Sequence, residues 1–325
     1  MESYLNKIKA KIRGSISLLA MTALVTSSLA GVYYYIDNKA DTQAQHTLSQ
    51  LLEDAKDEGV QLSYNSVDAS PLLRSVSISG FKIKGNADEP DITLGNVNIT
   101  GFNWQNLDQD TSQLPLSMSI TVDNALLHLK PSMVKNDANI QALIDNFGEQ
   151  VAFSTHLSYA LDQDSGILKI STTDTVIDNF YFNSELTLGG ANWLAELDTQ
   201  SKEDPFSEVM STTLNTFSII FKNEGIIEKI RAIAAKQTGQ TQEQLTRQSV
   251  NDIKRLQIVA EKNWGPLFVP MIDELIKFTI KPEQLTIRIN PEQAITSDAF
   301  MLGLLGGDAA LLELIKQAQI EIKAN

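Results

Sequence analysis

Apolar and polar residues alternate along much of the first two-thirds of this chain of 325 residues. The alternation begins at Leu62 and Tyr64 and continues to about residue 190, with Gly, Pro, Asn and Asp between the alternating segments. A period of two places successive side chains on opposite faces of a strand, and these four residue types are the usual turn formers. The pattern therefore predicts a series of short strands joined by turns into a mainly antiparallel sheet.

A six-residue motif occurs twice in this series, as residues 76–81 (VSISGF) and, 21 residues later, as 97–102 (VNITGF). In each copy the alternation shifts by one position at the glycine, Gly80 or Gly101. A β-bulge at each glycine would produce this shift and bend the strand. We therefore expect a curved sheet, which is either closed on its own core or open as a groove for an apolar ligand. The residues that would line this core or groove are Val76, Ile78, Phe81, Val97, Ile99 and Phe102.

The last third of the chain combines helical spacing with strand-like alternation. Apolar residues recur at helical spacing in residues 226–234 and 245–259. Between the two segments, Thr241 and Gln244 form the capping-box pattern that opens a helix. A short connection between two helices predicts an antiparallel helical hairpin, which we expect to be inserted among strands of the same sheet. Strand-like alternation returns in two short segments, 285–289 and 320–322.

An uncharged run of 23 residues, 14–36, precedes the alternating region. As a helix it would be about 34 Å long, which matches the hydrocarbon core of a bilayer. We therefore predict a transmembrane helix, and the alternative is a signal peptide cleaved after the small-x-small site at 28–30. Cations on the cytoplasmic side and tyrosines at the membrane surface are usual for spanning helices. The residues that fit these two roles are Lys7, Lys9, Lys11 and Arg13 before the run and Tyr33, Tyr34 and Tyr35 at its end.

These patterns predict an α+β fold. It comprises an N-terminal transmembrane helix, then a curved, bulged, mainly antiparallel β-sheet with a C-terminal helical hairpin insertion. The predicted divisions are a cytoplasmic basic tail (1–13), the transmembrane helix (14–36), a juxtamembrane helix (37–59), a β-rich periplasmic region (60–200), and an α+β periplasmic region that packs on the same sheet (201–325).

The charge of the chain limits its partners. Formal net charge is −14, and setting aside Glu2 and the four basic residues near the N-terminus leaves 22 Lys and Arg against 39 Asp and Glu. Such an acidic chain repels phosphate backbones, and no basic stripe with interleaved aromatics occurs, so nucleic acid is not expected as a partner. Because the chain has no cysteine, it forms no disulfide, which is compatible with a large domain in the periplasm of a Gram-negative bacterium.

The sequence contains no recognisable catalytic constellation. The three histidines, His46, His128 and His156, have no acidic residue or second ligand at metal spacing in the sequence. The sequence contains no nucleophile elbow, phosphate-binding loop, dinucleotide fingerprint or zinc-binding helix. We therefore expect a protein that is not an enzyme, with no catalytic, cofactor-binding or metal-binding residue to name; an enzyme with a dispersed active site is the remaining alternative.

The basic tail, the apolar run and the strands that follow resemble the AsmA-like periplasmic proteins of bacterial envelopes. The resemblance is carried by residues 14–104, through 64–67 (YNSV) and 69–71 (ASP) into the repeated motif. Residues 224–239 and 285–289 are similar to segments of uncharacterised, single-pass, inner-membrane-anchored periplasmic proteins. The AsmA-like resemblance implies a β-rich groove with an apolar interior and a role in lipid movement or outer-membrane homeostasis. The present chain is much shorter than the family members that bridge the envelope.

Two hypotheses for function follow. The first is an inner-membrane protein, with its N-terminus in the cytoplasm and its bulk in the periplasm, that binds a lipid or another apolar ligand in a curved β groove. The second is a structural or scaffold module that binds a partner protein of the cell envelope. Both include the membrane as a partner, and neither requires a cofactor.

Overall fold

The computed structural model describes residues 61–70, 74–84, 90–101, 115–135, 138–196 and 211–325. These residues form chiefly one antiparallel sheet of twelve strands. The strands are β1 (Gln61–Ser63), β2 (Ser66–Ser70), β3 (Ser75–Lys84), β4 (Asp91–Thr100), β5 (Ser117–His128), β6 (Gln150–Asp162), β7 (Ile167–Val176), β8 (Phe180–Gly189), β9 (Thr213–Asn223), β10 (Gln284–Ile289), β11 (Ile295–Thr296) and β12 (Ile320–Ala324).

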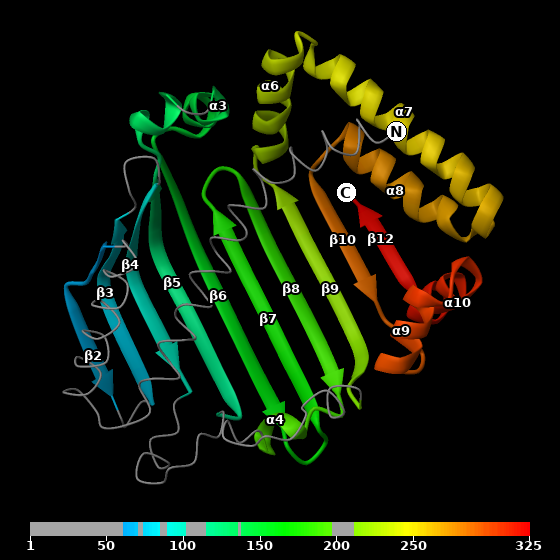
Figure 1. Cartoon of the computed structure of the whole chain (residues 1–325), viewed down its shortest axis with the longest axis horizontal. Coiled ribbons are helices and arrows are strands. Elements are labelled where there is room, and N and C mark those ends of the chain that lie inside the picture. The colour runs from blue at the N-terminus through cyan, green and yellow to red at the C-terminus, as the bar shows by residue number, and fades with distance from the viewer. Residues whose placement is uncertain (1–60, 71–73, 85–89, 102–114, 136–137, 197–210) are drawn as a thin grey trace.

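The strands follow one another across the sheet almost in chain order. The main path runs β1-β3-β4-β5-β6-β7-β8-β9-β10-β12, with β2 paired to β3 and β11 paired to β9. From β3 to β9 each strand is the antiparallel neighbour of the next in sequence, as Figure 1 shows from left to right. Because β10 and β12 pair with each other and β10 pairs with β9, the strands of the last third extend the same sheet.

The helices stand mainly at the two ends of the strands (Figure 1). At one end are α3, α6, α7 and α8, and at the other are α4, α9 and α10. Their bounds are α3 (Ala138–Phe147), α4 (Trp193–Glu196), α6 (Ile226–Thr238), α7 (Gln242–Trp264), α8 (Val269–Ile280), α9 (Ser297–Leu305) and α10 (Asp308–Ala318), with short 3-10 helices η2 (Pro131–Lys135) and η3 (Pro266–Phe268).

The capping box predicted at the start of α7 is confirmed. The Thr241 hydroxyl accepts from the backbone N–H of Gln244 at 3.1 Å, and the Gln244 side chain accepts from the backbone N–H of Thr241 at 2.8 Å. These two bonds satisfy N–H groups that the first turn of a helix leaves without partners.

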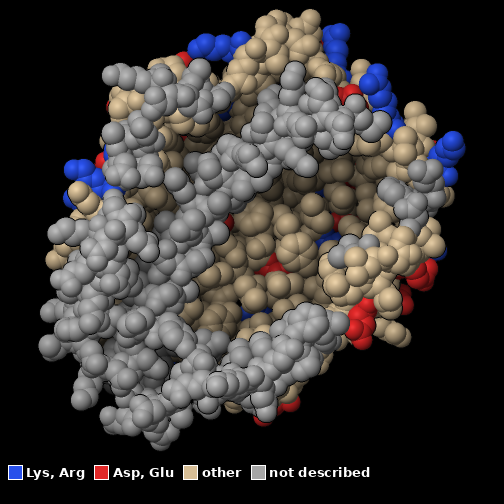
Figure 2. Space-filling model, viewed as in Figure 1, with Lys and Arg blue, Asp and Glu red and all other residues tan. Residues whose placement is uncertain are grey.

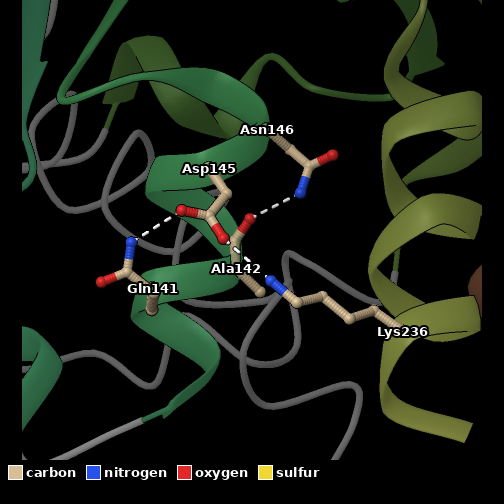
Figure 3. A network of polar contacts seen from close by, with 5 residues as sticks. All are labelled: Gln141, Ala142, Asp145, Asn146 and Lys236. Carbon is tan, nitrogen blue, oxygen red and sulfur yellow. Dashed lines mark hydrogen bonds and ion pairs between the residues drawn. The ribbon is translucent and has the colours of Figure 1, made fainter.

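A polar contact joins α3 to α6 across one end of the sheet (Figure 3). The Asp145 carboxylate accepts from Gln141 at 2.7 Å within α3 and forms an ion pair of 3.0 Å with Lys236 of α6. The hydrogen bond from Gln141, together with that from Lys236, lowers the pKa of the Asp145 carboxyl. Lys229 of α6 lies over the ring of Phe147 of α3, 5.0 Å from its centroid. The two helices are therefore in contact at this end of the sheet.

A crease crosses the first part of the sheet. In β3, β4 and β5 the buried positions shift phase at three residues that lie on one line across the strands, Gly80, Gly95 and Asn124. Gly80 and Asn124 have φ of 60° and 56°, in the left-handed region that favours glycine and asparagine. The register of β5 against β6 then shifts by one residue beyond Val122, and this bulge ends the crease.

The bulge predicted at Gly80 is wrong, whereas the bulge predicted at Gly101 falls where β4 ends, next to residues that lie outside the described part of the chain. Ser79 pairs with Asn96 and Phe81 with Leu94, so Gly80 lies opposite the glycine of the next strand and no extra residue is accommodated. Gly101, with φ of 99°, follows the last residue of β4 and marks its end.

The fold class predicted from the sequence is also wrong. The described part of the chain is mostly one large antiparallel β-sheet with several helices, whereas an α+β fold opening with a transmembrane helix was expected. None of the helices that the structure describes is long and apolar enough to cross a bilayer. The predicted spanning segment, residues 14–36, lies outside the described residues, as do the predicted tail and the juxtamembrane helix.

Candidate functional site

The two faces of the sheet differ in polarity. Residues paired across antiparallel strands point to the same face, so the registers define each face from β1 to β12. One face carries apolar partners in row after row, for example Ile219 opposite Ile287 and Ile287 opposite Ile322. The other face carries polar partners, such as Glu185 opposite Ser218. We call the first the apolar face.

The apolar face is fully buried over β3 to β5. The structure places Val76, Ile78, Phe81, Val97 and Ile99, five of the six residues expected to line a core or a groove, in one large buried cluster, at 0–7% exposure. Phe102 lies outside the described residues. Side chains so deeply buried form a packed core, and they present no accessible surface for a ligand.

Two smaller buried clusters lie elsewhere on this face. Leu161, Leu168 and Ala191 form one, against α4. Ile295, Leu314 and Ala318 form the other, where α10 packs near the ends of β9 and β12. Together with the large cluster they occupy one side and one end of the apolar face.

Between these clusters the apolar face is only half-buried. Figure 2 shows the molecule hollowed over the middle strands; most Lys and Arg lie at the edge of this view, and the surface inside the hollow is mainly tan with a few charged residues visible. Apolar residues of β8, β9, β10 and β12 share this part of the apolar face, and they belong to none of the three buried clusters. We call this region the central hollow; its six defining residues are Phe182, Leu186, Phe217, Ile219, Ile287 and Ile322.

An aromatic row borders the central hollow on the side of α8. The ring of Phe221 stacks against Phe180 with centroids 5.9 Å apart and meets the edge of Phe278, from α8, at 6.0 Å. Glu274 of α8 accepts from the backbone N–H of Ala324 at 2.8 Å, which fixes α8 to β12. Although α8 is rich in apolar residues, none of its side chains is fully buried. α8 is thus attached to the sheet without being packed into a closed core.

One carboxyl group lies on the apolar face beside the central hollow. Asp174 of β7 is paired with Thr155 of β6 on one side and with Phe182 of β8 on the other. The hydroxyl of Thr155, which is 3% exposed, donates a hydrogen bond to the Asp174 carboxylate. Burial raises the pKa of the Asp174 carboxyl, against the smaller lowering effect of the Thr155 bond. A carboxyl group is therefore held in apolar surroundings, where ionisation is costly.

The opposite face has a shallow depression of about 280 Å³ near the ends of β5, β6 and β7. Its lining is mostly hydroxyls, which bond across strands: Ser158 to Ser171 at 2.7 Å and Thr100 to Ser119 at 2.8 Å. Such pairs are ordinary on a solvated sheet face, so they do not by themselves indicate a ligand.

The two described histidines have hydroxyl partners on neighbouring strands. His128 lies 3.4 Å from the Thr93 hydroxyl and His156 lies 2.9 Å from the Thr121 hydroxyl. Among the described residues, no group of three His, Asp or Glu side chains lies close enough to hold a metal ion. His46 lies outside the described residues. So do the predicted anchor residues, which are Lys7, Lys9, Lys11, Arg13, Tyr33, Tyr34 and Tyr35.

Sequence patterns alone did not point to the central hollow. Apolar residues alternate at Phe217, Ile219 and Phe221 and again in 285–289, and this alternation indicates which side chains share a face. Whether that face is covered depends on elements distant in the sequence. One signal in the sequence could have indicated the central hollow. Phe217, Ile219 and Phe221 alternate without a charged residue between them.

Residues 175–325 match a family model described as "Uncharacterized protein". The match covers less than half of the chain, but it includes β8 to β12 and therefore every residue that defines the central hollow. No curated protein matches the chain. The resemblance to AsmA-like proteins stays a prediction.

Proposed function

We propose that this protein binds an apolar ligand, such as the acyl chain of a lipid, in the central hollow. The observation that carries the proposal is the set of six paired apolar side chains that stay half-buried on a hollowed face, outside every buried cluster (Figure 2). Sites for small apolar molecules are typically concave, lined by hydrophobic and aromatic side chains, and supplied with few polar groups. The central hollow and its aromatic border have this composition.

The energetics favour an occupant. Apolar surface removed from water contributes about 25 cal/mol per Å², or about 0.8 kcal/mol for each buried CH₂ group. A long alkyl chain that covers the half-buried side chains therefore removes its own surface from water, which contributes several kcal/mol. The surface of those side chains that it covers contributes further free energy of binding. Ordering the alkyl chain costs free energy that offsets part of this gain. We therefore expect a moderate affinity.

A dye titration with a matched pair of variants tests the proposal. N-phenyl-1-naphthylamine, a neutral dye that fluoresces in apolar surroundings, is titrated into the purified full chain. Ile219 lies on the apolar face and its neighbour Ile220 on the opposite face of the same strand. We expect Ile219→Ser to weaken dye binding several-fold and Ile220→Ser to leave it unchanged. Equal effects of the two variants, or no dye binding to the wild type, would remove the proposal, provided that circular dichroism shows both variants to be folded.

A second candidate function is supported by exposed apolar side chains outside the central hollow. Leu256 and Ile258 of α7 are 65% and 67% exposed, and Leu302 and Leu305 of α9 are 68% and 77% exposed. Exposed apolar groups gathered on helices are typical of surfaces that bind another protein. The alternative proposal is therefore a scaffold module whose α7 or α9 contacts a partner protein of the envelope.

Photo-crosslinking in cells separates the two candidates. A photoreactive amino acid at Leu186, in the central hollow, should give lipid adducts if the first proposal holds. The same amino acid at Leu256 or Leu302 should give a discrete protein adduct if the second holds. A protein adduct from Leu186 without lipid adducts would favour the scaffold over the lipid-binding function.

We propose the periplasmic side of a bacterial inner membrane as the place of this activity. The support is the order of basic and apolar residues before residue 37, the acidic remainder and the lack of cysteine. Cell fractionation with protease treatment of spheroplasts tests this location. Recovery of the intact chain in the cytoplasmic fraction would contradict it.

A further inference from the structure

Asp174 stands among apolar and hydroxyl side chains on the apolar face. Its cross-strand partners are Thr155 and Phe182, and its neighbours two positions away along β7 are Thr172 and Val176. Phe182 is itself a residue of the central hollow, so the carboxyl group lies directly at its border. A ligand that covers Phe182 has Asp174 next to it.

The described residues offer this carboxylate a hydrogen bond but no ion pair. Thr155 donates to it, and among the ion pairs formed by described residues none includes Asp174. The nearest strands place their basic residues, Lys169 and Lys222, on the opposite face, since both alternate with apolar-face positions. A carboxylate in apolar surroundings without a cation is an unfavourable arrangement that a cationic ligand would relieve.

Aromatic rings beside the carboxylate favour the same class of ligand. Phe182 is directly paired with Asp174, and Phe180, two residues away on β8, stacks on Phe221. The faces of aromatic rings attract cations, and the attraction grows as the cation loses water. An ammonium group near Asp174 would meet a carboxylate and aromatic rings together, whereas a carboxylate head group would meet like charge.

We propose that Asp174 selects the head group of the ligand, and that this ligand is a single-chain amphiphile with a protonated amine. The ammonium group pairs with the Asp174 carboxylate, and the alkyl chain runs along the apolar face from Phe182 toward Leu186, a span of about 13 Å at the usual rise of a strand. The inference rests on the proposed binding of an apolar ligand in the central hollow and adds to it the chemistry of the head group.

Competition between three ligands of equal chain length tests this inference. Decylamine, decanol and decanoate are used at pH 7 to displace N-phenyl-1-naphthylamine from the full chain. For the wild type we expect decylamine to bind about tenfold or more tightly than decanoate, the size of effect usual for a charge-assisted hydrogen bond, with decanol between them. In Asp174→Asn the ratio of decylamine affinity to decanoate affinity should fall to within about twofold.

Glu185→Gln is the matched control. It removes the same charge from the neighbouring strand, but Glu185 pairs with Ser171 and lies on the opposite face. Because the whole chain is acidic, this control separates a local contact from general attraction of cations. We expect Glu185→Gln to keep the wild-type preference.

Three results would overturn the inference: no preference in the wild type, an unchanged preference in Asp174→Asn, or an equal loss in Glu185→Gln. In each of these cases the proposed function would still hold if Ile219→Ser weakens dye binding. Absence of dye binding to the wild type would instead remove the proposed function, and the selection of a head group with it.

Discussion

Replacing Ile99 and Ile219 by alanine, one at a time, measures whether the central hollow is open to solvent. Both residues lie on the apolar face of the same sheet, but Ile99 is 0% exposed within the large cluster and Ile219 is half-buried outside every cluster. Truncation of a fully buried isoleucine costs about 2–5 kcal/mol, because it loses transfer free energy and leaves a cavity. At Ile219 water already reaches the side chain and can fill the space, so we expect a cost of about 1–2 kcal/mol.

Urea unfolding followed by circular dichroism provides the assay. With a slope of about 2–3 kcal/mol per molar urea, Ile99→Ala should lower the unfolding midpoint by roughly 0.7–2.5 M, and Ile219→Ala by roughly 0.3–1 M. Ile220→Ala, on the opposite face of β9, is the control for loss of strand propensity. If Ile219→Ala proves as destabilising as Ile99→Ala, the central hollow is a filled core. It is then not open to solvent, and the proposed function fails.

Three further predictions concern the crease, the α7 cap and Asp174. Gly95→Ala should destabilise the protein by about 1–3 kcal/mol, because an added Cβ would lie 2.9 Å from a backbone oxygen of β5; a thermal melt checks this, and an unchanged melting temperature would contradict it. Thr241→Ala should cost about 1 kcal/mol by removing the bond to Gln244, whereas Thr246→Ala, one turn further into the helix, should cost less in the same urea assay. The folded-state pKa of Asp174 is raised, so its ionisation penalty is present at neutral pH and is relieved as pH falls through that pKa. The unfolding free energy of the wild type minus that of Asp174→Asn should accordingly increase from pH 7 toward pH 4, and a constant difference would refute the assigned environment.

Local features of this fold could be predicted from local sequence. The cap of α7 needs only Thr241 and Gln244 in the right spacing, and both bonds are present. The alternation at Val76 and Ile78 likewise indicates a shared face, because the period of two is a property of a single strand.

Features that depend on a neighbouring strand could not be read in the same way. The phase shift at Gly80 suggested an inserted residue, but its partner strand shifts at the facing Gly95, and only the register reveals this. The strands at 285–289 and 320–322 were expected in the same sheet, but their spacing did not show that they pair with each other or that the first of them pairs with β9.

The candidate site was the hardest part to predict. Ile99 and Ile219 have the same side chain and similar alternating surroundings, yet one is fully buried and the other is not. The difference comes from what packs above each strand, which no spacing rule contains. The environment of Asp174 could not be predicted for the same reason. The sequence shows a single acidic residue in an alternating strand, and only the strand register shows which residues lie next to it.

The excursion of α6, α7 and α8 between two paired strands has a consequence for folding kinetics. β3 to β9 can assemble by adding one strand after another in chain order, whereas β9 ends at Asn223 and its partner β10 begins only at Gln284. Pairing these strands requires closing a long loop, which slows the contact between them. The pairing is also delayed until β3 to β9 have formed and β9 is the edge strand. We therefore expect β10 and β12 to dock last and to exchange their amide hydrogens soonest. The part of the central hollow that these two strands form is then also the part of the sheet that opens first.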